Sequence, residues 1–208
     1  MAYYPVCLEM AGRGCLVVGG GPVAERKVTG LLEAGARVTV VSPSATERLL
    51  EWARTGRICL TLREYEADDL AGHSIVFAAT DDGLINAEVA RDARAAGVLI
   101  NAADDPAHCD FILPAVLTRG DLTVAVSTGG ASPALARMLR DELGTFLDRE
   151  HYAALARVAA DARRTLRDRG TPAPWERWRR ALGGEVRALI RADRLDMARE
   201  RLLDGLRS

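Results

Sequence analysis

CLVVGGGPVAERK, residues 15–27, joins an apolar run of strand length to three glycines and then to a helix-like pattern. Read as G-x-G-x-x-A, with Gly19, Gly21 and Ala24, the stretch matches the turn that holds the phosphates of a dinucleotide. Glycines alone would be weak evidence, since many serve only turns. The strand before them and the helix after them predict a nucleotide site here.

Each position of this turn meets a physical requirement. Gly19 allows the tight change of direction, and Gly21 lets a pyrophosphate approach a backbone that has no Cβ. Pro22 suits the first helical turn, where its missing N–H costs nothing, and the small Ala24 lets the helix lie close to the strand. The amides that remain, such as that of Val23, point at the phosphates, and the helix dipole favours their charge. We expect these five residues to bind the cofactor.

The first part of the chain continues to alternate between strand-like and helix-like patterns. Further strands are expected at residues 37–41, 58–65, 74–79 and 98–101. Helices are expected at residues 23–33, 46–54 and 84–96. Apolar strands separated by amphipathic helices predict an α/β fold, with a Rossmann-type parallel sheet covered on both faces.

The alternation of strand-like and helix-like patterns ends after residue 110. Two apolar runs, residues 111–117 and 122–126, flank a turn and predict a β-hairpin. Ser132 is a good N-cap for a following helix, and Pro133 suits its first position. From there the pattern is helical, with breaks at residues 170–174 and 183–184. We therefore expect a nucleotide-binding domain over residues 1–110, a hairpin–helix region over 111–148 and a helical domain over 149–208.

Composition limits the class of protein. The chain has 208 residues, 49% of them hydrophobic, which is enough for a full core and a smaller appended part. Its four cysteines are scattered and form no C-x-x-C pair, so neither a disulfide framework nor a thiolate metal site is indicated. The start does not resemble a signal peptide, and no apolar run approaches the roughly 20 residues of a membrane span. We expect a cytoplasmic protein, with neither a membrane nor a nucleic acid as partner and with no resident metal.

The net charge of −1 hides a division along the chain. Residues 149–208 contain 15 arginines and 9 acidic residues, whereas residues 1–148 carry a net charge of −7. Arginine holds carboxylates and phosphates with a planar fork of donors. The basic segment fits an anionic second substrate, attraction between the two parts, or simply solvated helix faces.

Three further places carry candidate site residues. The second strand ends Ser42-Pro43-Ser44, without the acidic residue that usually holds the adenosine ribose, so these residues alone leave NAD and NADP open. The fourth strand runs into Thr80, Asp81 and Asp82, where Thr80 is placed to contact a ribose and Asp82 to cap a helix. The fifth strand leads to Asn101 and Asp104. Ligands of open parallel sheets bind at this edge, and Asp104 is a candidate proton acceptor.

Four motifs in this order resemble the precorrin-2 dehydrogenase family, which includes the N-terminal part of siroheme synthase. They are residues 19–27 (GGGPVAERK), 78–82 (AATDD), the loop from Asn101 to Asp104, and 126–137 (VSTGGASPALAR). The resemblance covers about residues 1–145 and keeps the order of the motifs.

This resemblance implies oxidation of precorrin-2 to sirohydrochlorin with NAD, in tetrapyrrole (siroheme) biosynthesis. It places the acidic residue of the family on Asp104 and a segment that lines the substrate cleft on Ser127 and Thr128. Asn101, and Arg137 as a partner for a substrate carboxylate, are further candidate substrate contacts. It assigns the adenosine side of the cofactor to Ser42, Pro43 and Ser44. Thr80 and Asp81, at the end of the fourth strand, are further candidate cofactor contacts. It further implies a homodimer formed through residues 111–147 and a helical C-terminus that helps to enclose the tetrapyrrole.

Two other hypotheses stay open at this point. Some members of the family also insert iron into sirohydrochlorin in the same cleft. His108 lies close to Asp104 in the sequence, but no spaced His/Glu cluster of the kind that holds a metal appears. A module that senses NAD without chemistry is the second alternative. Such a module would not need the Asp104 loop and residues 127–133 together, which argues against it.

Overall fold

The structure is a computed structural model that describes residues 3–103 and 105–207. Asp104, the predicted proton acceptor, therefore lies outside the described residues. The chain forms two compact units, one ending at Ile112 and the other beginning at Leu113. Each unit is described by itself.

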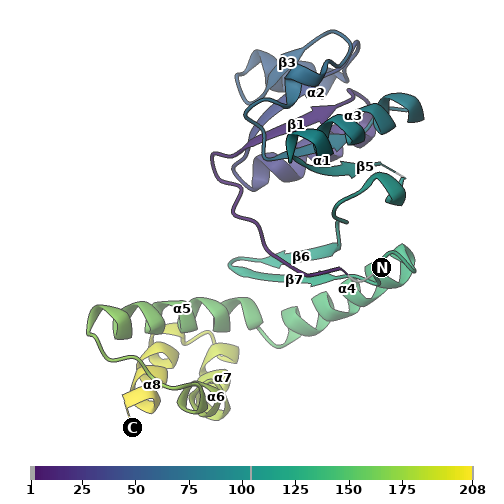
Figure 1. Ribbon diagram of the computed structural model, residues 1–208. Coiled ribbons are helices and arrows are strands. Elements are labelled where there is room, and N and C mark those ends of the chain that lie inside the picture. The colour runs from purple at the N-terminus through teal and green to yellow at the C-terminus, as the bar shows by residue number, and fades with distance from the viewer. Residues whose placement is uncertain (1–2, 104, 208) are drawn as a thin grey trace. The chain divides into compact units, whose positions relative to one another are not determined.

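The first unit is built on a five-stranded parallel sheet in the order β3-β2-β1-β4-β5 (Figure 1). Its strands are β1 (Gly14–Val18), β2 (Arg37–Val41), β3 (Cys59–Thr61), β4 (Ile75–Ala78) and β5 (Leu99–Ala102). Crossing from β3 back to β4 places β1 at the centre. The carboxyl end of β1, which leads into the glycines, thus lies between those of β2 and β4. This is the predicted Rossmann-type topology.

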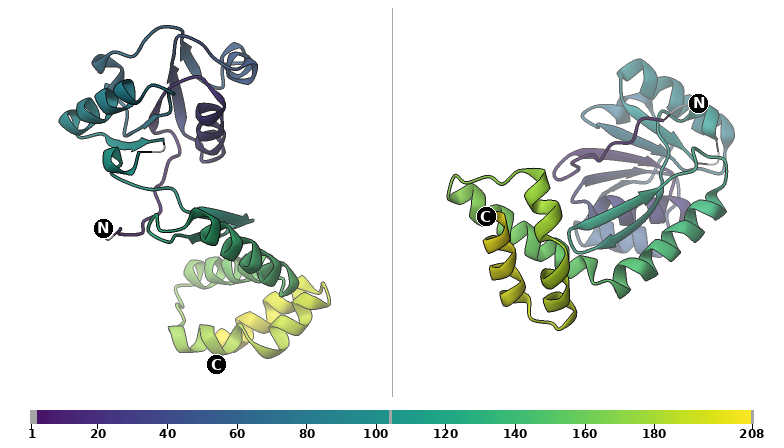
Figure 2. Two further views of the ribbon diagram at one scale, coloured as in Figure 1. Left: turned by 90° about the vertical axis from the view of Figure 1, so that its right-hand side faces the viewer. Right: turned by 90° about the horizontal axis from the view of Figure 1, so that it is seen from below.

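Helices cover both faces of this sheet. They are α1 (Pro22–Glu33), α2 (Glu47–Arg54) and α3 (Gly83–Ala96), with 3-10 turns η1 (Ala67–Leu70) and η2 (Pro106–His108). Alternate residues of β1 enter two cores: Cys15 and Val17 pack with α1 and α2, whereas Leu16 and Val18 pack with α3. The left view of Figure 2 shows the purple α1 and the teal α3 on opposite faces. Burial on both faces explains the continuous apolar runs of the strands.

Most boundaries in this unit lie within one residue of the expectation, and the largest difference is in the third strand. The third strand was expected over residues 58–65 but ends at Thr61. Arg63 instead turns toward Asp69, with Nη1–Oδ2 and Nη2–Oδ1 distances of 2.8 and 2.6 Å. Asp69 and Glu66 form a reciprocal capping box that starts η1. The fifth strand also runs one residue further, to Ala102.

The second unit begins with an antiparallel hairpin, β6 (Ala115–Arg119) and β7 (Leu122–Val126). The expected hairpin is confirmed, but β6 begins four residues later than predicted and includes Thr118 and Arg119, so the turn is only two residues long. Both strands contact α4 (Pro133–Arg149), which is capped by Ser132 as expected. Gly144 of α4 faces Leu117 of β6, where an added Cβ would make an ordinary van der Waals contact at 3.6 Å.

Four more helices complete the second unit: α5 (Tyr152–Asp168), α6 (Trp175–Ala181), α7 (Gly184–Arg191) and α8 (Leu195–Arg207). Leu155, Val158, Ile190, Leu202 and Leu206 belong to their common core. The breaks at His151 and Asp193 were not predicted. Both residues take a left-handed backbone, with φ of 54° and 55°, which ends one helix and starts the next. Within the described ranges no helix is both long and apolar enough to cross a membrane.

Candidate functional site

The turn after β1 contains two glycines whose positions leave no room for a Cβ atom. Gly19 has φ of 121°, and a Cβ there would lie 2.4 Å from the carbonyl oxygen of Ala79. A Cβ on Gly20 would lie only 1.8 Å from the carbonyl oxygen of Ser44. The turn is therefore wedged between the segments that follow β4 and β2. The motif gave Gly20 no role, and its requirement appears only once the loop after β2 is in place.

Gly21 differs from both, because an added Cβ would meet nothing within 4 Å among the described residues. The turn therefore has no packing requirement for glycine at this position. An open surface beside the first turn of a helix is what the approach of a phosphate requires. The geometry fits the role that the sequence predicts for Gly21.

The first turn of α1 presents backbone donors at this surface. Gly21 is the N-cap and offers no side chain to the helix, and Pro22 follows it. Within the described part of the chain, no backbone carbonyl is assigned to the amides of Val23 and Ala24, whereas the amide of Glu25 bonds to Gly21. Ala24 is fully buried against the sheet. Free amides and the positive end of the helix dipole favour an anion.

Residues 42–44 lie directly against the turn. Ser42 is buried and its amide donates to Thr61 at 3.2 Å, while Pro43 and Ser44 are exposed. The amide of Thr46 donates to the carbonyl of Gly20 at 2.9 Å, so this loop and the glycine turn are joined by the backbone. The structure brings these predicted adenosine-side residues next to the predicted phosphate site. Their contact with a nucleotide stays a prediction.

Beyond β4, Thr80 is tied to a polar side chain that the sequence analysis missed. The Thr80 hydroxyl lies 2.8 Å from Oδ1 of Asn86, and the Nδ2 of Asn86 donates to the Thr80 carbonyl at 3.1 Å. Asn86 is buried on the otherwise apolar inner face of α3, a position that could have marked it. Asp82 caps α3 by accepting from the Leu84 amide at 2.8 Å, as predicted, and Asp81 is exposed.

The loop that leaves β5 doubles back onto its own strand. The amide of Asp110 donates to Ile100 at 2.8 Å, and its carboxylate accepts from the Ile100 amide at 3.2 Å. The Cys109 thiol lies 3.2 Å from both the amide and the carbonyl of Ala102, and burial raises its pKa. These contacts make Cys109 a structural residue and fix both ends of the segment that contains Asp104 in sequence.

Two residues near Asp104 in the sequence, Asp105 and Asn101, also form side-chain hydrogen bonds. His108 Nδ1 and Asp105 Oδ2 are 2.5 Å apart, and this hydrogen bond lowers the pKa of the Asp105 carboxyl. Asn101 is 6% exposed, and its Nδ2 donates to the Phe111 carbonyl at 2.9 Å. Asn101 thus holds the loop in this structure, and its predicted contact with substrate stays a prediction. No group of three metal-binding side chains occurs within residues 3–103 and 105–207.

The remaining predicted residues belong to the second unit. Ser127 is exposed and accepts from the Gly129 amide, and the Thr128 hydroxyl exchanges two hydrogen bonds with the backbone of Ser132, at 2.9 and 3.0 Å. The segment is therefore an ordered turn ahead of α4. Arg137 is exposed on α4. Two other arginines of this region are paired with carboxylates, Arg119 with Asp148 and Arg140 with Asp141.

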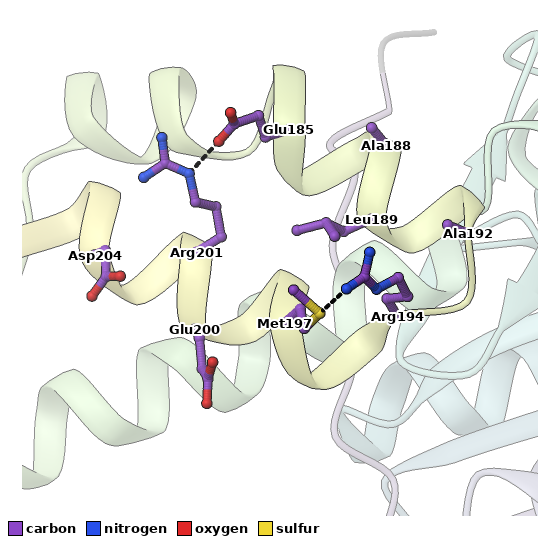
Figure 3. A pocket seen from close by; sticks show the side chains of 9 residues that line it. All are labelled: Glu185, Ala188, Leu189, Ala192, Arg194, Met197, Glu200, Arg201 and Asp204. Carbon is purple, nitrogen blue, oxygen red and sulfur yellow. Dashed lines mark hydrogen bonds and ion pairs between the residues drawn. The ribbon is translucent and has the colours of Figure 1, made fainter.

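A groove of about 600 Å³ lies on the helical part of the second unit, along α7 and α8 (Figure 3). Its charges are largely balanced, since Arg201 pairs with Glu185 and the groove also contains Glu200, Asp204 and Arg194. None of the predicted site residues lines it. The groove therefore does not change the assignment of the site to the sheet edge.

Comparison with known proteins finds the same two parts. A family model described as "Putative NAD(P)-binding" matches residues 6–115, and one described as "Sirohaem biosynthesis protein central" matches residues 119–145. The siroheme synthase of Methylococcus capsulatus is 44% identical over 99% of this chain and 44% of its own length. That of Nitrosococcus oceani is 42% identical over 99% of this chain and 43% of its length. The chain thus spans less than half the length of these relatives.

A solved structure shares the whole architecture. "SirC, precorrin-2 dehydrogenase" superposes with a TM-score of 0.73 and 26% sequence identity, covering 99% of each chain. This match extends through the C-terminal helices, beyond the region that the sequence motifs reach.

Proposed function

We propose that the chain, which belongs to the precorrin-2 dehydrogenase family, oxidises precorrin-2 to sirohydrochlorin with NAD. The observation that carries the proposal is the open backbone at Gly21, beside the unpaired helix amides, at the edge of the sheet where the Asp104 loop leaves β5. The nucleotide turn after β1 and the end of β5, from which the chain continues toward Asp104, then belong to one edge of one sheet.

The chain would hold the cofactor mainly with backbone. We propose that the amides of Val23 and Ala24 bind the pyrophosphate over Gly21, with Gly19 and Pro22 shaping the turn. Ser42, Pro43 and Ser44 would contact the adenosine side, and Thr80 and Asp81 are further proposed cofactor contacts. When bound, NAD supplies the acceptor for a hydride. The absence of an acidic residue after β2 leaves the adenosine ribose to the serine hydroxyls.

Oxidation also releases a proton, which the chain must accept. We propose Asp104 as that acceptor, because a carboxylate at this edge can take a proton or stabilise positive charge that develops on the pyrrole nitrogens. Much of the driving force comes from conjugation in the product, so orientation of the two reactants is the main task of the protein. Asn101, Ser127, Thr128 and Arg137 are proposed substrate contacts, the last through a carboxylate of the tetrapyrrole.

We propose further that the protein is a cytoplasmic homodimer. Leu135, Met138, Leu139, Leu143 and Phe146 form an exposed apolar stripe on α4, with 37–52% of each residue accessible. These residues recur every three or four positions and therefore share one side of the helix. A stripe of this size favours a protein partner, and a second copy is the simplest one.

The test is anaerobic incubation of the protein with precorrin-2 and NAD. Formation of NADH together with the sirohydrochlorin spectrum, above the rate without protein, is the expected result. The Gly21→Asp variant is the matched control, because it places bulk and negative charge against the pyrophosphate while leaving the interior unchanged. Binding of NAD without any product would instead favour the sensing module.

The same preparation tests the second candidate, iron insertion. Sirohydrochlorin and Fe²⁺ are supplied without NAD, and siroheme is followed by its absorbance. Metal insertion that survives Gly21→Asp would identify a bifunctional enzyme, whereas no insertion would limit the protein to dehydrogenation.

A further inference from the structure

The only lysine of the chain, Lys27, is placed between the nucleotide turn and the Asp104 loop. It lies on α1, five residues after Pro22, and is partly buried. Its ammonium donates to Oδ1 of Asn101 at 3.2 Å and stands 5.3 Å from the centre of the Phe77 ring. Apart from three histidines, all other basic residues of the protein are arginines, and the sequence motifs assign no role to Lys27.

The orientation of the Asn101 amide is set by chemistry. An ammonium can only donate and a backbone carbonyl can only accept, so Oδ1 must face Lys27 and Nδ2 must face Phe111. Asn101 therefore bridges α1 to the far end of the loop. Replacing the ammonium with an apolar group would leave a buried amide oxygen without this donor.

The aromatic rings close the same cluster. Phe111 packs edge-on against Phe77, with ring centres 5.6 Å apart and planes at 87°. Lys27 thus contacts Phe77 through the ring and reaches Phe111 through Asn101. We call Lys27, Phe77, Asn101 and Phe111 the Lys27 cluster. It joins α1, β4 and both ends of the Asp104 loop within the first unit.

We propose that Lys27 is a positioning residue that couples occupation of the nucleotide turn to the order of the loop carrying Asp104. The cofactor anchor and Lys27 belong to one helix, so a phosphate that fixes the start of α1 also fixes the lysine and, through Asn101, the loop. The inference rests on the proposed function for its catalytic consequence. The coupling itself requires only that NAD binds.

The test uses the full chain and three variants. Lys27→Met keeps the length of the side chain but removes charge and donor, Lys27→Arg keeps both, and Arg26→Met removes the charge of an exposed neighbour on the same helix. Amide hydrogen exchange over residues 99–112 is compared with and without NAD. In the wild type and in Arg26→Met, NAD should slow this exchange, and in Lys27→Met the protection by NAD should disappear.

The catalytic arm measures kcat, KM for precorrin-2 and Kd for NAD. For Lys27→Met we expect kcat to fall about 10-fold or more, with Kd for NAD changed less than about 3-fold and with Lys27→Arg restoring most of the rate. A merely structural lysine would lower the melting temperature and NAD affinity together. In that case Lys27→Met would also keep the NAD-induced protection. A joint loss of melting temperature and NAD affinity, or protection that persists in Lys27→Met, would each overturn the proposal.

Failure of the proposed function gives a different outcome. If the wild type binds NAD but does not oxidise precorrin-2, the enzymatic proposal fails while the exchange experiment still decides the role of Lys27. Equal protection by NAD in the wild type and in Lys27→Met overturns the coupling, whatever the chemistry.

Discussion

The glycine turn of the first unit and the α4 surface of the second unit are built on opposite principles. At the turn, function depends on side chains that are missing: Gly19 and Gly20 permit contacts that any Cβ would block, and Gly21 leaves the backbone open. On α4, function would depend on side chains that are present and exposed, such as Met138 and Phe146. The geometry of a backbone binding site is set by one chain alone. The role of an exposed apolar stripe depends on which partner covers it.

The glycine turn should respond most strongly of the two regions to a single added methyl group. Gly20→Ala would place its Cβ 1.8 Å from the Ser44 carbonyl oxygen, and the backbone bond from Thr46 to Gly20 holds the two segments together. We expect a loss of about 3 kcal/mol of stability, at the upper end of overpacking costs. Thermal unfolding measures it. Gly21→Ala is the matched control and should unfold like the wild type while binding NAD more weakly.

Asp104 tests whether the chemistry belongs to the same edge as the turn. Asp104→Asn should lower kcat about 100-fold, as expected for the loss of an acid–base group, with NAD affinity unchanged. Steady-state kinetics and a binding titration separate the two quantities. Asp105→Asn is the matched control, because that carboxylate is already engaged by His108. Full turnover in Asp104→Asn would remove Asp104 from the mechanism.

The α4 surface is tested by a charge in its exposed stripe. Met138→Glu places a carboxylate among Leu135 and Leu139, which lie on the same face of the helix. If a second copy covers the stripe, burying this charge should weaken the dimer by about 2 kcal/mol or more. Sedimentation at several concentrations measures the change. Arg137→Glu, on the opposite side of α4 from the stripe, serves as the comparison. A dimer that withstands Met138→Glu would place the interface elsewhere.

These two regions also differ in how far the sequence predicts them. The Rossmann topology and the turn were predictable because only glycine satisfies the turn and because the strand and helix periods change abruptly around it. The role of Gly20 was not, since its neighbour Ser44 comes from a loop 24 residues later. The break between α4 and α5 was missed because His151 takes a left-handed backbone with neither glycine nor proline to signal it. Asn86 and Lys27 were missed because their partners come from other segments of the chain.

The smallest expected effect concerns two bidentate ion pairs, one in each unit. Arg63–Asp69 in the first unit and Arg119–Asp148 in the second are both two-pronged, with N–O distances of 2.6–2.9 Å. The Asp69 side chain is 12% exposed and the Asp148 side chain 53%. Solvent screening should therefore make the second pair weaker. We expect Asp69→Asn to cost about 1 kcal/mol at neutral pH, and Asp148→Asn to cost clearly less.

The pH dependence of this difference has a definite sign. Hydrogen bonding to Arg63 lowers the pKa of Asp69 in the folded protein. Its stabilisation is therefore complete above the unfolded-state pKa of about 3.9 and is lost as the pH falls through the lower, folded-state pKa. Urea unfolding of the wild type and Asp69→Asn from pH 7 to pH 3 should show a constant gap that closes only at the acidic end. A gap that closes with added salt at pH 7, as expected for Arg119–Asp148, would mean that Asp69 is as well solvated as Asp148 and that burial does not distinguish the pairs.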